Sequence, residues 1–301
     1  MTTSDAGWQV TTEPAVLLPG RRAVVRVNYT PSRDHESRGV HATIRCVERY
    51  RYDTHETSTD ANGVTHTRTV THDDEDELHR FGVELAGPRR FSAGGTQIWE
   101  FDWEVPGLGP PTFEGDVLRC DWALETKADI RMRPDERAEH RLLVAQPTAL
   151  LRAGVVHTGQ YGLYEEAPAN LDHLPAQISL NPVPLCLGAP FSGAFTVQTA
   201  EPVEVQEVRL ELRTKVEVTV SGGHEEEITV ARGRLEHGDR GLFGGEFAVH
   251  RFVADATEAW LPSVDLAHGR ARATFHVILA RAWAPDIHYV RDVALATTAE
   301  L

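Results

Sequence analysis

The side chains most able to do chemistry gather in one stretch, THTRTVTHDDEDELHR, at positions 65–80. It combines histidines with a run of carboxylates, namely His66, His72, Asp73, Asp74, Glu75, Asp76, Glu77 and His79. Carboxylate oxygens suit hard divalent cations and imidazole suits zinc or nickel, so one interpretation is a metal site. The stretch has neither the glycine-containing loop of an EF-hand nor HExxH spacing. We favour the other interpretation, a solvated acidic loop at the end of a hairpin, and expect no metal or cofactor.

A second group of carboxylates, Glu114, Asp116 and Asp121, lies in and after the turn sequence PPTFEGD at 110–116. The chain then alternates between charged residues and an apolar face formed by Leu118, Cys120, Trp122, Leu124, Ala128 and Ile130. A two-residue period is typical of a β-strand with one buried face. We expect Trp122 in the core and Asp121 on the solvated side, where cross-strand pairing explains it. All three carboxylates are therefore interpreted as structural.

A hydrolase is the alternative from a different class of protein. The FSG sequence at 191–193 is not a GxSxG nucleophile elbow, and His157 and His173 have no partnered nucleophile nearby in the sequence. Residues far apart in a chain can still assemble a triad in space. A deep pocket that holds His157 or His276 beside an acid and a nucleophile would favour this alternative. Without one, no catalytic residue is assigned.

The sequence segments that position these residues have the alternating pattern that predicts β-strands. In the first half, HATIRCVERYRY at 41–52 and QIWEFDWEV at 97–105 both alternate, and Asn62-Gly63 suits a hairpin turn. The second half repeats the plan, with VQEVRLELRTKVEVTV at 205–220, a turn at SGGH and a second alternating run.

Two copies of one supersecondary plan predict an all-β chain with two tandem antiparallel immunoglobulin-like β-sandwich domains. We place an N-terminal sandwich at 1–147, a connecting segment at 148–175 and a C-terminal sandwich at 176–301.

Composition narrows the classes of partner. The chain has 301 residues, with 45 Asp and Glu against 30 Lys and Arg, so its formal net charge is −15. This balance and the lack of a basic cluster in the sequence argue against nucleic acid and anionic membranes. No apolar run approaches the roughly 20 residues of a membrane helix. Cys46, Cys120 and Cys186 are expected to be free thiols of a cytoplasmic protein.

One region resembles a known family. PPTFEGDVLRCDWALETKADIRMRP at 110–134, with WEFDWEVP before it and HRLLVAQP after it, resembles the N-terminal domain of arrestin-fold proteins. Arrestins, the arrestin-fold retromer subunits and the bacterial sporulation-control proteins are tandem β-sandwiches, which fits the repeated plan. The resemblance implies a non-catalytic adaptor or scaffold that binds proteins through loops, concave sheet faces or strand edges. The alternative is a hydrolase or metal-binding protein with a site at a sandwich end or domain junction.

The candidate partner-binding surface consists of Asp73, Asp74, Glu75, Asp76 and Glu77. Such a run of carboxylates would steer a protein with a basic surface toward the chain. The simpler alternative is solvated surface charge with no partner.

Overall fold

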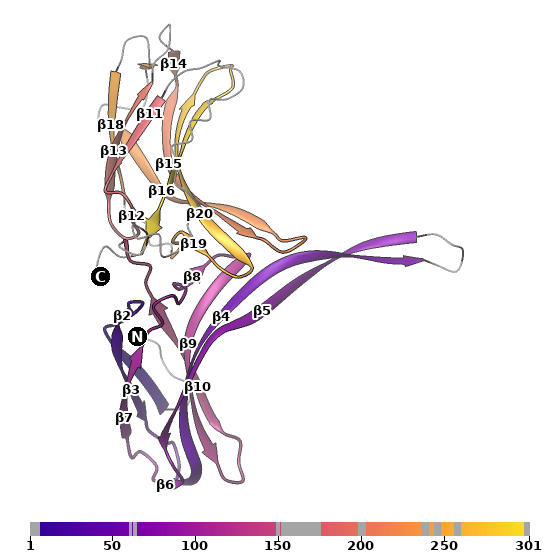
Figure 1. Cartoon of the computed structure of the whole chain (residues 1–301), viewed down its shortest axis with the longest axis vertical. Helices are drawn as coiled ribbons and strands as arrows, with labels where there is room; N and C mark the ends of the chain where they lie inside the picture. The colour runs from indigo at the N-terminus through magenta and orange to yellow at the C-terminus, as the bar shows by residue number, and fades with distance from the viewer. Residues whose placement is uncertain are drawn as a thin grey trace. The chain divides into compact units, whose positions relative to one another are not determined.

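The described elements of the chain are all β-strands (Figure 1). The computed structural model describes residues 7–59, 62, 65–148, 151, 176–197, 203–235, 241–243, 248–255 and 260–297. Within these residues, no helix is long and apolar enough to cross a membrane. The prediction of an all-β chain is confirmed.

The chain divides into two compact units. Unit 1 contains Met1–Tyr50, His72–Glu114 and Arg119–Ala145, and unit 2 contains Arg51–Thr71, Gly115–Leu118 and Gln146–Leu301. The main division at 145/146 lies near the sequence boundary at 147/148, but two short inner segments belong to unit 2 rather than to the first half. Most of the connecting segment expected at 148–175 lies outside the described residues.

Unit 1 is built on two sheets. The smaller sheet has the order β1-β3-β7, with β1 Trp8–Glu13, β3 Arg22–Tyr29 and β7 Gln97–Glu104. The larger sheet has the order β2-β10-β9-β4-β5, with β6 on β4 and β8 on β9. Its strands are β2 Val16–Leu17, β4 His35–Thr59, β5 Thr65–Ala86, β6 Arg89–Phe91, β8 Phe113–Glu114, β9 Leu118–Ile130 and β10 Glu136–Val144.

The two sheets of unit 1 meet through aromatic side chains. Trp122 of β9 is fully buried, and its ring centroid lies 5.6 Å from that of Trp103 on β7. The Trp122 indole N–H donates to the carbonyl of Pro110 at 2.8 Å, so the polar end of the ring is satisfied. Tyr29 and Trp8 stack with ring centroids 4.1 Å apart toward the other end of the smaller sheet, where Tyr29 pairs with Gln97. The prediction that Trp122 lies in the core is confirmed, and unit 1 is a β-sandwich.

The cysteines also follow the predicted alternation. Cys46 of β4 and Cys120 of β9 are fully buried, and their Sγ atoms lie 3.4 Å apart as free thiols. The hydrogen bond to Cys46 and burial raise the pKa of the Cys120 thiol well above its usual value. Both side chains are buried and pack as small apolar groups. Cys186 is free and half-buried.

Unit 2 contains one long sheet with the order β11-β13-β18-β16-β15-β20-β19, and β21 pairs with β20. Two short pairs, β12-β22 and β14-β17, accompany it. The strands are β11 Ala176–Asn181, β12 Leu185–Cys186, β13 Phe191–Val197, β14 Val203–Val205, β15 Glu207–Val218, β16 Glu225–Leu235, β17 Gly241–Phe243, β18 Ala248–Ala254, β19 Val264–Asp265, β20 Gly269–Ala280, β21 Ile287–Val293 and β22 Leu295–Ala296.

The long sheet of unit 2 folds over its own core. Phe252 of β18 stacks on Phe275 of β20, with ring centroids 5.0 Å apart, and Phe191 meets the same ring edge-on. Gly193 of β13 leaves space for this packing, because a Cβ atom there would lie 2.5 Å from the Phe252 ring. Phe191 and Phe252, on the paired strands β13 and β18, therefore pack against Phe275 of the more distant strand β20 in the same sheet.

The two units share an order of neighbouring strands. Unit 1 has β10-β9-β4-β5, and unit 2 has β21-β20-β15-β16 in matching positions. In each case the first strand of a hairpin, β4-β5 or β15-β16, pairs with a long strand, β9 or β20. That long strand pairs in turn with β10 or β21. The repetition that the sequence predicted for the hairpins and long strands is present in the pairing of the strands.

We predict that Trp122→Ala will destabilise unit 1 by roughly 3 to 5 kcal/mol, since it removes a fully buried ring from the contact between the two sheets. Ile98→Ala on β7 is the matched control, because Ile98 is 61% exposed and its loss should cost about 0.5 kcal/mol or less. Urea unfolding followed by circular dichroism measures both. Similar costs for the two variants would contradict the assigned faces.

Candidate functional site

The acidic segment Asp73 to Glu77 lies within β5, so the expectation that it forms a loop is wrong. It is part of a strand that pairs with β4. Because side chains alternate along a strand, its five carboxylates do not form one continuous outward surface. Charge alone suggested a loop, whereas cross-strand partners on β4 make a strand possible.

The outward carboxylates of the segment contact arginines. Glu75 receives a hydrogen bond from Arg49 Nε at 3.1 Å, and Glu77 lies 2.8 Å from Arg80 Nε and 3.9 Å from Arg45 Nη1. The contact with Arg80 holds the pKa of Glu77 below its usual value. These two carboxylates therefore neutralise arginines of their own unit.

The other side of the segment contacts Tyr50 of β4. Burial, followed by the carboxylates of Asp76 and Asp74, raises the pKa of Tyr50, whose hydroxyl group bonds to Asp76. Further along β5, His79 contacts the buried Trp122 at a ring distance of 5.6 Å. Glu77 and His79, two residues apart on β5, therefore have different neighbours, arginines for Glu77 and the buried indole ring for His79.

The metal-binding interpretation gains no support from this geometry. In the described part of the chain, no three His, Cys, Asp or Glu side chains are grouped so that they could hold a metal ion. Glu75 and Glu77 are paired with arginines, and Asp76 bonds to the Tyr50 hydroxyl on the other face of the strand. These three carboxylates are therefore directed toward different partners rather than toward one common point.

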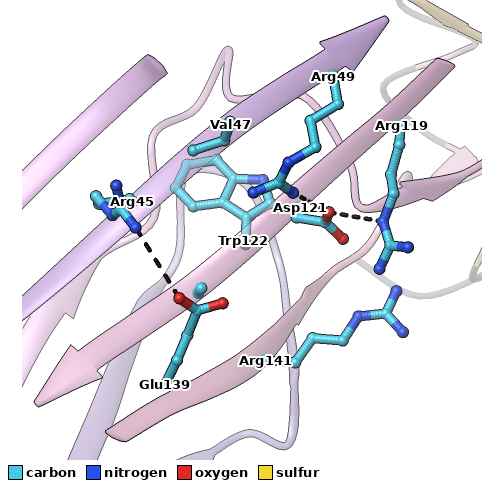
Figure 2. A pocket seen from close by; sticks show the side chains of 9 residues that line it. Arg45, Val47, Arg49, Arg119, Asp121, Trp122, Glu139 and Arg141 are labelled. Carbon is cyan, nitrogen blue, oxygen red and sulfur yellow. Dashed lines mark hydrogen bonds and ion pairs between the residues drawn. The ribbon is translucent and has the colours of Figure 1, made fainter. Parts of the chain in front are cut away.

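The chemically most distinctive surface of unit 1 is an arginine-lined hollow on the outer face of β4, β9 and β10 (Figure 2). We call it the arginine pocket. Its volume is about 400 Å³, and it is lined by Arg45, Val47, Arg49, Arg119, Asp121, Trp122, Ala123, Glu139 and Arg141. Four guanidinium groups thus surround one small hollow in a chain whose net charge is −15.

Asp121 lies at the centre of the arginine pocket. Its Oδ2 atom lies 2.6 Å from Arg49 Nη1 and 2.6 Å from Arg119 Nε, so one carboxylate oxygen serves two arginines (Figure 2). The side chain is only 14% exposed. The outward direction predicted for Asp121 is confirmed, but the solvated environment expected there is wrong, because cross-strand arginines cover the carboxylate.

The other two arginines of the pocket also have carboxylate partners. Arg45 pairs with Glu125 of β9 and lies 4.0 Å from Glu139 of β10. Arg141 of β10 pairs with Glu114, and burial lowers the pKa of the Arg141 guanidinium. Carboxylates and guanidinium groups thus alternate across β5, β4, β9 and β10.

The turn carboxylates behave differently from one another. Glu114 pairs with Arg141, which agrees with a structural role. Asp116 is exposed in the turn that delivers the chain into β9, where Gly115 N–H donates to the carbonyl of Leu118 at 3.0 Å.

Sequence reasoning missed the four arginines of the pocket, although their positions carried a signal. Arg45 and Arg49 occupy odd positions of β4, whereas the buried Ile44 and Cys46 occupy even positions. Arg119 of β9 precedes the buried Cys120. Alternation predicts that all three point outward. It does not reveal that strands 70 residues apart bring them together.

The candidate histidines give the hydrolase alternative no oriented base. His276 of β20 is buried, and its Nε2 atom lies 2.9 Å from the Thr274 hydroxyl. Its Nδ1 atom, which an acid would hold in a triad, is buried without a hydrogen-bond partner. Glu211, directly across the strands, is held by Arg213 at 2.6 Å. His157 and His173 lie outside the described residues.

Comparison with known proteins does not identify the chain. No protein-family model matches it, and no curated protein matches its sequence.

We predict that Asp121→Asn will destabilise unit 1 by roughly 1 to 3 kcal/mol, because it removes the charged acceptor that two arginines share. The matched control is Asp102→Asn on β7, whose ion pair with Arg22 is exposed and should contribute about 1 kcal/mol or less. Urea unfolding at low ionic strength compares the two. A loss for Asp121→Asn no larger than that for the control would show that Asp121 is not a structural centre.

Proposed function

We propose that the chain is a non-catalytic, arrestin-like adaptor with two tandem immunoglobulin-like sandwiches. The repeated neighbour order, β10-β9-β4-β5 in unit 1 and β21-β20-β15-β16 in unit 2, supports this proposal. The sequence around β9 adds support, because its Pro-Pro-x-Phe-Glu-Gly turn resembles that of arrestin-fold proteins. Tandem sandwiches present large sheet faces, which suit the binding of other proteins.

The observation that carries the proposal is the charged outer face of β5, β4, β9 and β10. Side chains there alternate between guanidinium and carboxylate groups from four strands, for example Glu75, Arg49, Asp121 and Arg119. Such a face is too polar to be an internal packing surface. It offers directional ion pairs and hydrogen bonds of the kind that give specificity to protein interfaces.

The acidic segment Asp73 to Glu77 borders this face and sets the chemistry of the partner. Arginines partly neutralise Glu75 and Glu77, yet all five carboxylates remain exposed along β5. Together with a net charge of −15, they favour encounter with a basic protein surface. The proposed partner is therefore a protein that presents clustered lysine or arginine.

We predict that changing Asp73, Asp74, Glu75, Asp76 and Glu77 to Asn or Gln will slow association with a partner captured by affinity purification from the native host. The reason is electrostatic steering, so the difference should shrink above about 0.15 M salt, where the screening length is about 8 Å. Stopped-flow or surface-plasmon measurements give the association rate.

The control variant removes the same charge elsewhere in unit 1. It changes the exposed residues Glu13, Glu84, Glu100, Asp102 and Glu104 to Gln or Asn. A global charge effect would slow both variants equally and would contradict a role for the acidic segment. An unchanged rate in the segment variant at low salt would also remove the segment from the interface.

A further inference from the structure

Two residues other than glycine have a positive φ in the part of the chain that the structure describes. They are Met132, with φ 61°, and Trp283, with φ 60°. A left-handed backbone is strained for a bulky residue, because its Cβ atom comes too close to the following carbonyl oxygen. Glycine or asparagine would occupy such a position at a lower cost. Backbone strain of this kind is associated with functional sites.

The two strained residues lie in corresponding turns of the two units. Met132 lies between β9 and β10, and Trp283 lies between β20 and β21. Each is followed by proline two residues later and by aspartate three residues later. On the relative scale Met132 is 92% exposed and Trp283 is 104% exposed, so neither side chain packs on its own unit. Both turns therefore carry a large, hydrated apolar side chain where glycine would suit the fold better.

The turn that carries Trp283, residues 281–286, is braced by hydrogen bonds at its base; we call it the Trp283 turn. Arg281 donates from Nε and Nη2 to the carbonyl of Pro285, at 2.9 and 2.5 Å. Asp286 accepts from Arg209 of β15 at 2.6 Å. These contacts fix the backbone around Trp283, so the turn needs little further ordering when the indole ring binds.

The chemistry of the Trp283 turn favours a protein partner over a membrane. Tryptophan is enriched among the few residues that dominate the free energy of protein interfaces, where one side chain fills a pocket. Binding to a membrane surface instead scales with the apolar area inserted and with attraction to anionic lipids. The turn has one large apolar side chain, flanked by the small Ala282 and Ala284, and the chain has a net charge of −15.

We propose that the Trp283 turn is a docking point, and that the indole ring of Trp283 enters an apolar pocket on a partner protein. Burial of a fully hydrated ring supplies hydrophobic free energy, and an acceptor in the pocket satisfies the indole N–H. The inference rests on the proposed adaptor function. It adds to that function a contact in unit 2, whereas the acidic segment belongs to unit 1.

Trp283→Gly tests whether the side chain serves the fold. We expect a urea midpoint no lower than that of the wild type, because glycine relieves the left-handed strain and no packing is lost. Met132→Gly should behave in the same way. A clearly lower midpoint for Trp283→Gly would show that the indole ring supports unit 2, and would overturn the proposal.

Photo-cross-linking in the native host tests for the partner. The full chain carries Trp283→p-benzoylphenylalanine, and the matched control carries the same probe at Leu108, which is 83% exposed in a turn of unit 1. We expect discrete protein adducts from position 283 that position 108 does not give. Adducts with lipid only, equal adducts from both positions, or no adduct from position 283 would each overturn the proposal.

The cross-linked protein, once purified, allows a kinetic test. Trp283→Ala should raise its dissociation rate constant at least tenfold, which corresponds to about 1.4 kcal/mol. The association rate should hardly change, because no charge is removed. Trp283→Phe keeps an aromatic ring, so its dissociation rate should lie between those of the wild type and Trp283→Ala.

The two kinetic effects separate this inference from the rest of the proposed function. An unchanged dissociation rate in Trp283→Ala would overturn the docking point alone. An unchanged association rate in the acidic-segment variant would count only against that segment. Absence of any captured partner in the affinity purification would instead count against the adaptor function as a whole.

Discussion

The opposite directions of Trp122 and Asp121, two adjacent residues of β9, organise unit 1. Trp122 points inward and joins the two sheets through Trp103, while Asp121 points outward and holds Arg49 and Arg119. A shift of β9 by one residue would bury the carboxylate and expose the indole ring, so the core and the charged face enforce the same register. The fold and the candidate site are therefore specified together.

This shared register explains why the charged face is ordered. Arginine side chains are long and lose conformational entropy when they are fixed, and isolated surface ion pairs contribute little. Here each arginine side chain starts from a paired strand, and Asp121 is largely covered by its partners. Several ion pairs on one rigid sheet support one another, which separates this face from scattered surface charge. The acidic segment belongs to the same lattice because β5 pairs with β4.

Much of the fold could be predicted from local alternation. The period of β9 placed Trp122 inside, β4 and β5 on either side of the predicted Asn62-Gly63 turn are neighbours in the sheet, and SGGH at 221–224 matched the turn between β15 and β16. These features depend on neighbouring residues, so a single sequence contains the information. The site depends on which distant residues become cross-strand neighbours, and no local pattern supplies that.

Two errors illustrate the limit. A run of five carboxylates resembled a loop because like charges repel, but arginines on β4 and Tyr50 provide the partners that make it a strand. Asp121 resembled a solvated residue because it lies on the charged face of an alternating strand, yet Arg49, 72 residues away, covers it. Both errors come from pairing across strands.

The central claim is that the outer face of unit 1 is a fixed lattice of ion pairs built on β9. A double-mutant cycle between Arg49→Gln and Asp121→Asn, measured by urea unfolding, tests it most directly. The account predicts a coupling free energy of at least about 1 kcal/mol between the two side chains. A coupling of about 0.3 kcal/mol or less would mean that the two groups are independent, solvated charges, and would contradict the claim.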